Sequence, residues 1–257
     1  MCPFYQPHLR PDTDLTSPTG IRFVRLTGRV SALAGRMVQV SEELTIDGTL
    51  TRWSTADRAG MPLLVLLHGY GADEHDLFGL TPYLPDGVAV ASVAAPLSPP
   101  WPTPGRSWYA IEGLDGRSPD SVTAAARAFL HWLDEAAADA PAVALLGFSQ
   151  GAAVALQAMR LAPERVDTVV ALSGYVASGE LLNDESLTER KPHVFWGRGT
   201  NDQVIPEARI VHTAQWLPAH SELSGRVYTG LTHSISEDEL GDVHAFLTKW
   251  LSREAKS

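Results

Sequence analysis

One stretch, residues 142–160, limits the folds open to this chain more than any other part of the sequence. A short apolar run over residues 142–146 leads directly into residues 147–151, which read Gly-Phe-Ser-Gln-Gly, and an alanine-rich helical segment follows. A serine on a sharp turn needs small neighbours, because a strand and a helix approach closely only where bulky side chains are absent. Ser149 is the one serine in the chain with glycine at both second neighbours. The stretch therefore predicts a strand, a tight turn that carries Ser149, and a helix.

Strands alternate with helices from residue 62 to the end. Continuous apolar runs bounded by glycine or proline are typical of strands buried on both faces. The predicted strands are 37–40, 49–53, 62–67, 88–95, 142–146, 168–172, 193–197 and 226–229, and the predicted helices are 122–138, 152–160, 207–217 and a last one that opens at a capping box of Ser236 and Glu239. This order indicates an α/β protein with a mainly parallel central sheet and helices on both faces. In such a sheet a G-x-S-x-G turn resembles the nucleophile elbow of the α/β-hydrolase fold.

The chain has 257 residues, 44% of them apolar, which fits one large domain, and we place it at residues 37–257. Residues 1–36 differ, with five arginines against two aspartates, a net +3 that leaves −13 for the remainder. Four prolines interrupt their first half, so we expect a flexible N-terminal extension. Two alternatives stay open: translation starts naturally at Met37, or the extension is an interaction segment.

Composition argues against several classes of protein. A net charge of −10 disfavours nucleic acid as a partner, since phosphates attract basic surfaces. No apolar run of about 18 residues predicts a transmembrane helix, and the N-terminus lacks the pattern of a signal peptide. Cys2 is the one cysteine, which excludes an internal disulfide and a cysteine-based metal cluster. We predict a cytoplasmic protein without stable membrane insertion, cofactor or catalytic metal; its oligomeric state is not predicted.

Ser149 becomes a nucleophile only if a base takes its proton and an acid orients that base. In the α/β-hydrolase fold these partners follow the serine in the order acid, then histidine. His233 follows the last predicted strand, and Asp202 follows the strand 193–197 through a glycine-bearing turn. Because active sites collect at the carboxyl ends of parallel strands, we predict His233 as the base and Asp202 as the acid.

Acyl transfer also needs donors for the oxyanion of the tetrahedral intermediate. The fold supplies the backbone N–H of the residue after the nucleophile, here Gln150. A second donor comes from the loop after the strand 62–67, which reads His-Gly-Tyr-Gly over residues 68–71. We predict the backbone N–H of Tyr70 for this role.

With these residues assembled, the chain resembles the phospholipase/carboxylesterase family, which includes bacterial carboxylesterases and acyl-protein thioesterases. The matching segments are residues 67–73, 147–152, 199–206 and 232–236, of which Gly-Phe-Ser-Gln-Gly is the most specific. The resemblance implies the same roles for Ser149, Asp202 and His233, and for the N–H groups of Tyr70 and Gln150. It also implies that Trp108, in the proline-rich loop 96–109, contacts the substrate.

The leading hypothesis is therefore a serine carboxylesterase that acts through an acyl-enzyme on short-to-medium acyl esters. Lysophospholipids and acyl thioesters stay open as substrates, because the loop 96–109 is apolar. A hypothesis of another class is a binding protein that retains the fold without the chemistry.

Overall fold

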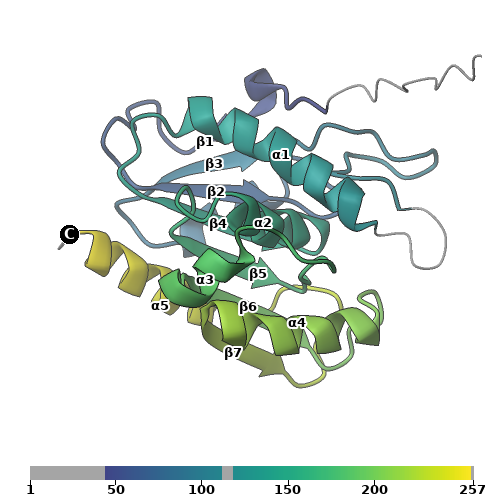
Figure 1. The fold of residues 1–257 in the computed structure, drawn as a ribbon. Helices are drawn as coiled ribbons and strands as arrows, with labels where there is room; N and C mark the ends of the chain where they lie inside the picture. The colour runs from purple at the N-terminus through teal and green to yellow at the C-terminus, as the bar shows by residue number, and fades with distance from the viewer. Residues whose placement is uncertain (1–43, 112–117, 256–257) are drawn as a thin grey trace, which may run out of the picture. The chain divides into compact units, whose positions relative to one another are not determined.

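The computed structural model describes residues 44–111 and 118–255, so the predicted extension over residues 1–36 and the predicted strand 37–40 lie outside the described residues. Seven strands form one sheet in the order β1-β3-β2-β4-β5-β6-β7, and β1 alone runs antiparallel to its neighbour (Figure 1). The strands are β1 Arg52–Trp53, β2 Leu63–Leu67, β3 Ala89–Val93, β4 Val143–Phe148, β5 Thr168–Leu172, β6 His193–Gly199 and β7 Glu222–Tyr228. The helices are α1 Pro119–Ala136, α2 Gln150–Leu161, α3 Asp184–Arg190, α4 Glu207–His220 and α5 Glu237–Glu254, with 3-10 turns η1 Gly48–Leu50 and η2 Leu77–Tyr83.

Each face of the sheet has its own hydrophobic core, because side chains alternate between the two faces along a strand. In β2, Leu63, Val65 and Leu67 join the core that packs against α1 and α2, whereas Leu64 and Leu66 join the core beneath η2 and α5. All residues of β2, β3 and β5 are buried. These layers confirm the predicted architecture of a mainly parallel sheet with helices on both faces (Figure 1).

The predicted strand boundaries are wrong at both edges of the sheet. Residues 49–53 were expected as one strand, but η1 occupies the first part, where Asp47 Oδ1 accepts a hydrogen bond from the Thr49 N–H at 3.0 Å. At the other edge β7 begins at Glu222, four residues before the predicted start. Edge strands are partly exposed and carry polar residues, so the continuous apolar runs that reveal inner strands are missing.

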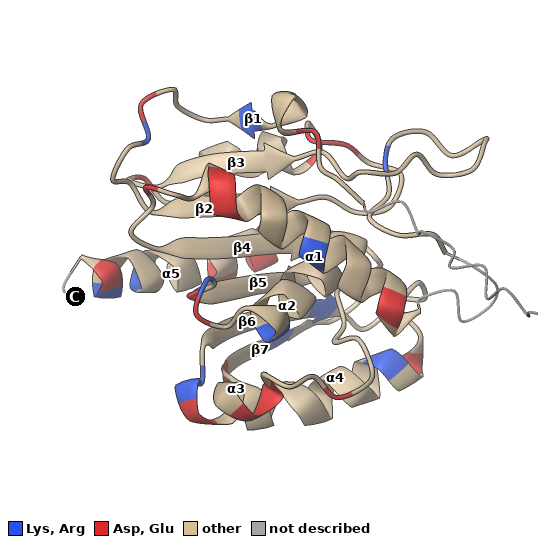
Figure 2. Ribbon diagram, turned by 45° about the horizontal axis from the view of Figure 1, so that its top comes forward, with Lys and Arg blue, Asp and Glu red and all other residues tan. Residues whose placement is uncertain are grey.

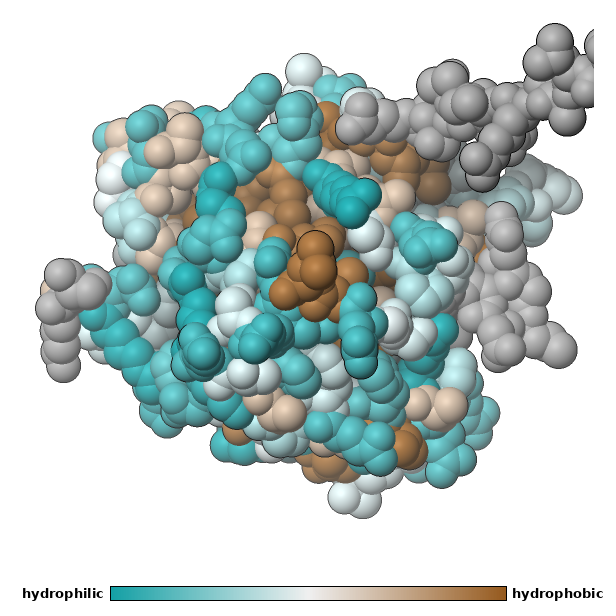
Figure 3. All heavy atoms as spheres, in the orientation of Figure 1, coloured by the Kyte–Doolittle hydropathy of each residue, from teal (hydrophilic) through white to brown (hydrophobic). Residues whose placement is uncertain are grey.

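Charged residues avoid the centre of the sheet. Strands β2 to β5 contain no charged residue, and Figure 2 shows Lys, Arg, Asp and Glu mainly on the helices and connecting loops. The surface in Figure 3 is largely hydrophilic, with hydrophobic residues gathered near its middle. Among the described residues, no helix has the length and apolarity that crossing a membrane requires.

A buried arginine connects the helix that follows Ser149 with the neighbouring loops. Arg160 of α2 is fully buried, and its guanidinium donates two hydrogen bonds to Asp184, at 2.8 and 2.6 Å. It also donates to Gln157 Oε1 at 3.1 Å and to the carbonyl oxygens of Ala177 and Gly179, each at 2.7 Å. Burial alone would raise the pKa of Asp184, but the bonds from Arg160 and the Leu181 N–H, together with the charge of Arg160, outweigh it and hold that pKa below its usual range.

We expect Arg160→Met to lower the free energy of unfolding by about 3–5 kcal/mol, because it leaves a largely buried carboxylate without its cation. Urea denaturation measures the loss. Arg165→Met is the matched control: Arg165 pairs with Asp134 at the surface, so its loss should cost less than about 1 kcal/mol. Equal losses in the two variants would contradict this account of the buried pair.

The capping box that opens α5 is only half formed. Ser236 Oγ accepts a hydrogen bond from the Glu239 N–H at 3.2 Å, as predicted. The Glu239 side chain is fully buried, and neither carboxylate oxygen has a hydrogen-bond partner among the described residues. Burial raises the pKa of Glu239 to about 7 and the Asp242 carboxylate adds to the rise; the Ser236 N–H opposes it without reaching hydrogen-bonding geometry.

Glu239→Gln should therefore stabilise the protein at pH 8 much more than at pH 5. The native state keeps a proton on Glu239 up to pH about 7, whereas the unfolded chain loses it near pH 4.5, so stability falls as pH rises between these values. The gain from the variant should grow by about 2 kcal/mol between pH 5 and pH 8. Urea denaturation at both pH values measures it, with Glu237→Gln, exposed in the same turn, as control. A gain independent of pH would rule this explanation out.

Candidate active site

Ser149 lies at the junction of β4 and α2 in a strained conformation. Its φ of 54° and ψ of −112° fall in a region that residues with side chains rarely adopt. The Ser149 N–H donates to the Leu172 carbonyl of β5 at 2.9 Å, which anchors the turn to the sheet. A side chain at Gly147 would overlap the backbone of Ala152, and one at Gly151 would overlap the Leu67 carbonyl. Both glycines are thus required by close approach of the backbone.

His233 lies beside this serine. It sits in the loop between β7 and α5, and its Nε2 is 2.8 Å from Ser149 Oγ. The Phe148 ring packs against the imidazole, with ring centroids 4.9 Å apart. Only 17% of the His233 side chain is exposed, so its position is held by packing as well as by hydrogen bonds.

Asp202 lies on the far side of the imidazole. Its Oδ2 is 2.8 Å from His233 Nδ1, and its Oδ1 accepts hydrogen bonds from the N–H groups of Val204 and Ile205 at 2.9 and 3.2 Å. Burial alone would raise the pKa of Asp202, but the bonds from His233 and these N–H groups outweigh it and hold that pKa below its usual range. An ionised carboxylate only accepts hydrogen bonds, so Nδ1 carries the proton and Nε2 is free to accept one from Ser149.

The two residues predicted to supply the oxyanion donors, Tyr70 and Gln150, line the same cavity as Ser149. No described residue accepts a hydrogen bond from either backbone N–H. His68 fixes the loop that leads to Tyr70: its Nε2 accepts from the Ala95 N–H at 3.1 Å, so its Nδ1 donates to the Gly69 carbonyl at 2.7 Å. Burial lowers the pKa of His68, which favours this neutral form.

The cavity over Ser149 has a volume of about 220 Å³. It is lined by the last residue of β4, the first residue of α2 and residues from the loops after β2 through β7: Gly69, Tyr70, Ala72, Asp76, Tyr109, Ile111, Phe148, Ser149, Gln150, Tyr175, Val204 and His233. All these loops leave the carboxyl ends of their strands, where sites of parallel sheets are expected.

Trp108 does not line this cavity, which corrects the prediction that it contacts substrate. The residue is fully buried, and its indole Nε1 donates to the His68 carbonyl at 2.9 Å. Its backbone N–H donates to Gln150 Oε1 at 2.8 Å. Trp108 therefore packs behind the site, and the next residue, Tyr109, reaches the cavity instead.

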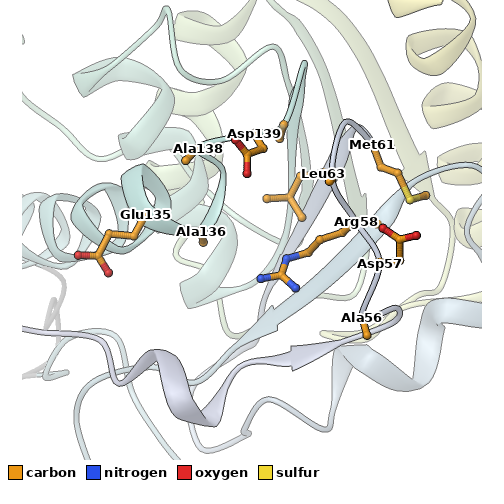
Figure 4. A pocket seen from close by; sticks show the side chains of 12 residues that line it. Ala56, Asp57, Arg58, Met61, Leu63, Glu135, Ala136, Ala138 and Asp139 are labelled. Atoms are coloured by element: carbon orange, nitrogen blue, oxygen red, sulfur yellow. The ribbon is translucent and has the colours of Figure 1, made fainter.

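A second cavity, of about 250 Å³, shows that size alone does not identify the site (Figure 4). Leu63 and Ala89, the first residues of β2 and β3, lie in its wall, so it opens at the amino ends of the strands. Figure 4 shows the Arg58 guanidinium directed into it, beside residues of the α1 C-terminus. Its lining contains neither serine nor histidine, whereas the cavity over Ser149 is lined by both Ser149 and His233.

Sequence reasoning gave no role to several residues that line the cavity, among them Phe148, Tyr175 and Val204, and of the aromatic pair Trp108-Tyr109 it selected Trp108. Tyr175 comes three residues after β5, and Val204 five residues after β6. The carboxyl-end rule that selected Asp202 could have selected these segments too. The contact between Phe148 and His233 joins residues 85 positions apart in the chain, and no local sequence pattern predicts it.

Comparisons with known proteins identify the family to which this chain is similar. The model of the Phospholipase/Carboxylesterase family matches residues 54–251. Acyl-protein thioesterase 1 of Saccharomyces cerevisiae is 36% identical over 110 residues, 41% of this chain and 48% of the yeast protein. The esterase YpfH of Escherichia coli is 29% identical over 191 residues, 70% of this chain and 78% of that protein. The chain thus spans about half the length of the curated thioesterase, and more of the curated esterase.

Solved structures share the fold. The crystal structure of esterase PE8 superposes with a TM-score of 0.64 at 27% identity, covering 80% of this chain and 99% of that one. The sheet, the helices on both faces and this likeness confirm the predicted α/β-hydrolase fold. Because the family model covers most of the described chain, this protein belongs to the phospholipase/carboxylesterase family.

Proposed function

We propose that this protein is a serine carboxylic-ester hydrolase that acts through an acyl-enzyme intermediate. The observation that carries the proposal is the chain of hydrogen bonds from Ser149 Oγ through His233 to Asp202, each 2.8 Å long, at the edge of a cavity. The names of the relatives, esterase and acyl-protein thioesterase, support an ester or thioester as the bond that is cleaved.

In the first half of the reaction, Ser149 Oγ attacks the carbonyl carbon while His233 Nε2 takes the serine proton. The oxygen of the tetrahedral intermediate becomes negative and accepts hydrogen bonds from the N–H groups of Tyr70 and Gln150. The C–O or C–S bond to the leaving group then breaks, and His233 gives its proton to the departing alcohol or thiol.

In the second half, water attacks the acyl-enzyme and gives a proton to His233, which returns it to Ser149 Oγ as the acid leaves. The buried carboxylate of Asp202 fixes the tautomer of the imidazole and stabilises the imidazolium that forms twice per cycle. All proton transfers use groups of this chain, and the proposal includes no cofactor, metal or nucleic acid partner. The cytoplasmic location stays a prediction of the sequence.

The acyl-enzyme is tested by partitioning between water and methanol. Butyrate esters with different leaving alcohols should give the same ratio of butyric acid to methyl butyrate, because all pass through one butyryl-enzyme. A ratio that changes with the leaving group would indicate direct attack by water and overturn the covalent mechanism. A binding protein without the chemistry would hydrolyse none of the esters or the matching butyryl thioester.

A further inference from the structure

Two tyrosines in the cavity wall are joined through their hydroxyl groups. The oxygens of Tyr109 and Tyr175 are 2.7 Å apart, and each residue is only 1% exposed although both line the cavity. Tyr109 belongs to the loop after β3, and Tyr175 follows β5. Since β2 and β4 lie between these strands, the pair connects loops on the two sides of Ser149.

Neighbouring residues hold both tyrosines in place. The Gln150 side chain donates to the Tyr109 carbonyl at 2.7 Å, and the Ser107 hydroxyl donates to the same oxygen at 2.6 Å. On the other side, the Arg209 guanidinium of α4 lies over the Tyr175 ring, 5.5 Å from its centroid. The bonds to its carbonyl hold the backbone of Tyr109, and a longer ligand could displace either ring only by breaking the bond between the hydroxyls.

The cavity is also small. Its volume of about 220 Å³ equals roughly seven times the ~30 Å³ that one water occupies in the liquid, and a methylene group is of similar size. A reacting carbonyl and a chain of a few carbons fill such a space.

We propose that the Tyr109–Tyr175 pair closes the acyl site and determines its specificity, so that the enzyme acts on esters of short acyl groups. This inference rests on the proposed function, because it takes Ser149 as the acylated residue. Both rings act by their volume, and the bond between the hydroxyls keeps them from turning aside. Chain-length preference should therefore follow the size of residue 175 more than its hydroxyl.

The test is kcat/KM for p-nitrophenyl esters from acetate to palmitate. The wild-type enzyme should prefer acetate or butyrate and fall steeply from octanoate onward. Tyr175→Ala should raise the octanoate-to-butyrate ratio by about tenfold or more, the discrimination expected for one added methylene in a closed apolar pocket. Tyr175→Phe keeps the ring but loses the bond between the hydroxyls, so it should raise this ratio much less than Tyr175→Ala does. Tyr83→Ala, which removes an exposed tyrosine outside the cavity, should leave the profile unchanged.

Two outcomes would overturn the inference: a wild-type preference for the longest esters, or an equal loss on all esters in Tyr175→Ala that remains folded by thermal denaturation. If Tyr175→Ala does not fold, Tyr175→Leu replaces it, and the same two outcomes, in this variant and in the wild-type profile, would overturn the inference. Failure of the proposed function looks different, because then no ester is hydrolysed and a fluorophosphonate does not label Ser149.

Discussion

Replacing Ser149 by alanine is expected to abolish ester hydrolysis. Without Oγ no acyl-enzyme can form, and losses on the order of 10⁶-fold in kcat follow removal of the serine from comparable triads. The residual rate would come from the oxyanion donors and from substrate binding alone. The measurement is turnover of p-nitrophenyl acetate and butyrate by purified wild-type and Ser149→Ala protein.

Ser173→Ala provides a matched control for this experiment. Ser173 directly follows β5, is 2% exposed and also has a positive φ, of 47°. Its Oγ has no hydrogen-bond partner among the described residues, and it does not line the cavity over Ser149. Turnover near the wild-type rate is expected for this variant. Turnover retained by Ser149→Ala would refute the assignment of the nucleophile.

Asp202→Asn is expected to lower kcat by about 10⁴-fold with little change in the fold. The asparagine oxygen can still accept from the Val204 and Ile205 N–H groups, so the loop keeps its shape. The amide nitrogen then faces His233 Nδ1 and donates a hydrogen bond to it, which moves the imidazole proton to Nε2. A protonated Nε2 can no longer accept the proton of Ser149.

The measurement is kcat for p-nitrophenyl butyrate, with circular dichroism to verify folding. Asp167→Asn is the control, because Asp167 lies before β5 at the opposite end of the sheet and accepts from the Val143 N–H at 2.7 Å. A loss of only a few fold in Asp202→Asn, or an equal loss in Asp167→Asn, would contradict the role of Asp202. Because the bonds from His233 and the backbone hold the pKa of Asp202 below its usual range, this carboxylate should stay ionised at every pH at which a free aspartate is ionised.

Much of the site could be predicted from the sequence because parallel strands place their carboxyl ends together. Inner strands such as β2 and β5 are continuous apolar runs, which made their ends readable. Residues that closely follow an inner strand, such as Asp202, were therefore expected near Ser149, because the carboxyl ends of parallel strands lie along one edge of the sheet. The glycines around Ser149 were readable for a related reason, since the turn leaves no room for side chains.

The remainder depends on contacts that no local pattern contains. The Gln150 side chain accepts from the Trp108 N–H and donates to the Tyr109 carbonyl, which fixes which of the two aromatic residues enters the cavity. The sequence shows both rings in an apolar loop and gives no means to choose between them, so Trp108 was chosen wrongly. Glu239 was expected to complete a capping box, but its side chain is buried against β6 instead.

The most direct test of the central claim is covalent labelling with a fluorophosphonate, followed by mass spectrometry of the intact protein and of its peptides. The account predicts one phosphonyl group per chain, located on Ser149, with loss of ester hydrolysis in proportion to labelling and slower labelling in Asp202→Asn. Full ester turnover by a protein that carries the label on another residue, or on none, would contradict it.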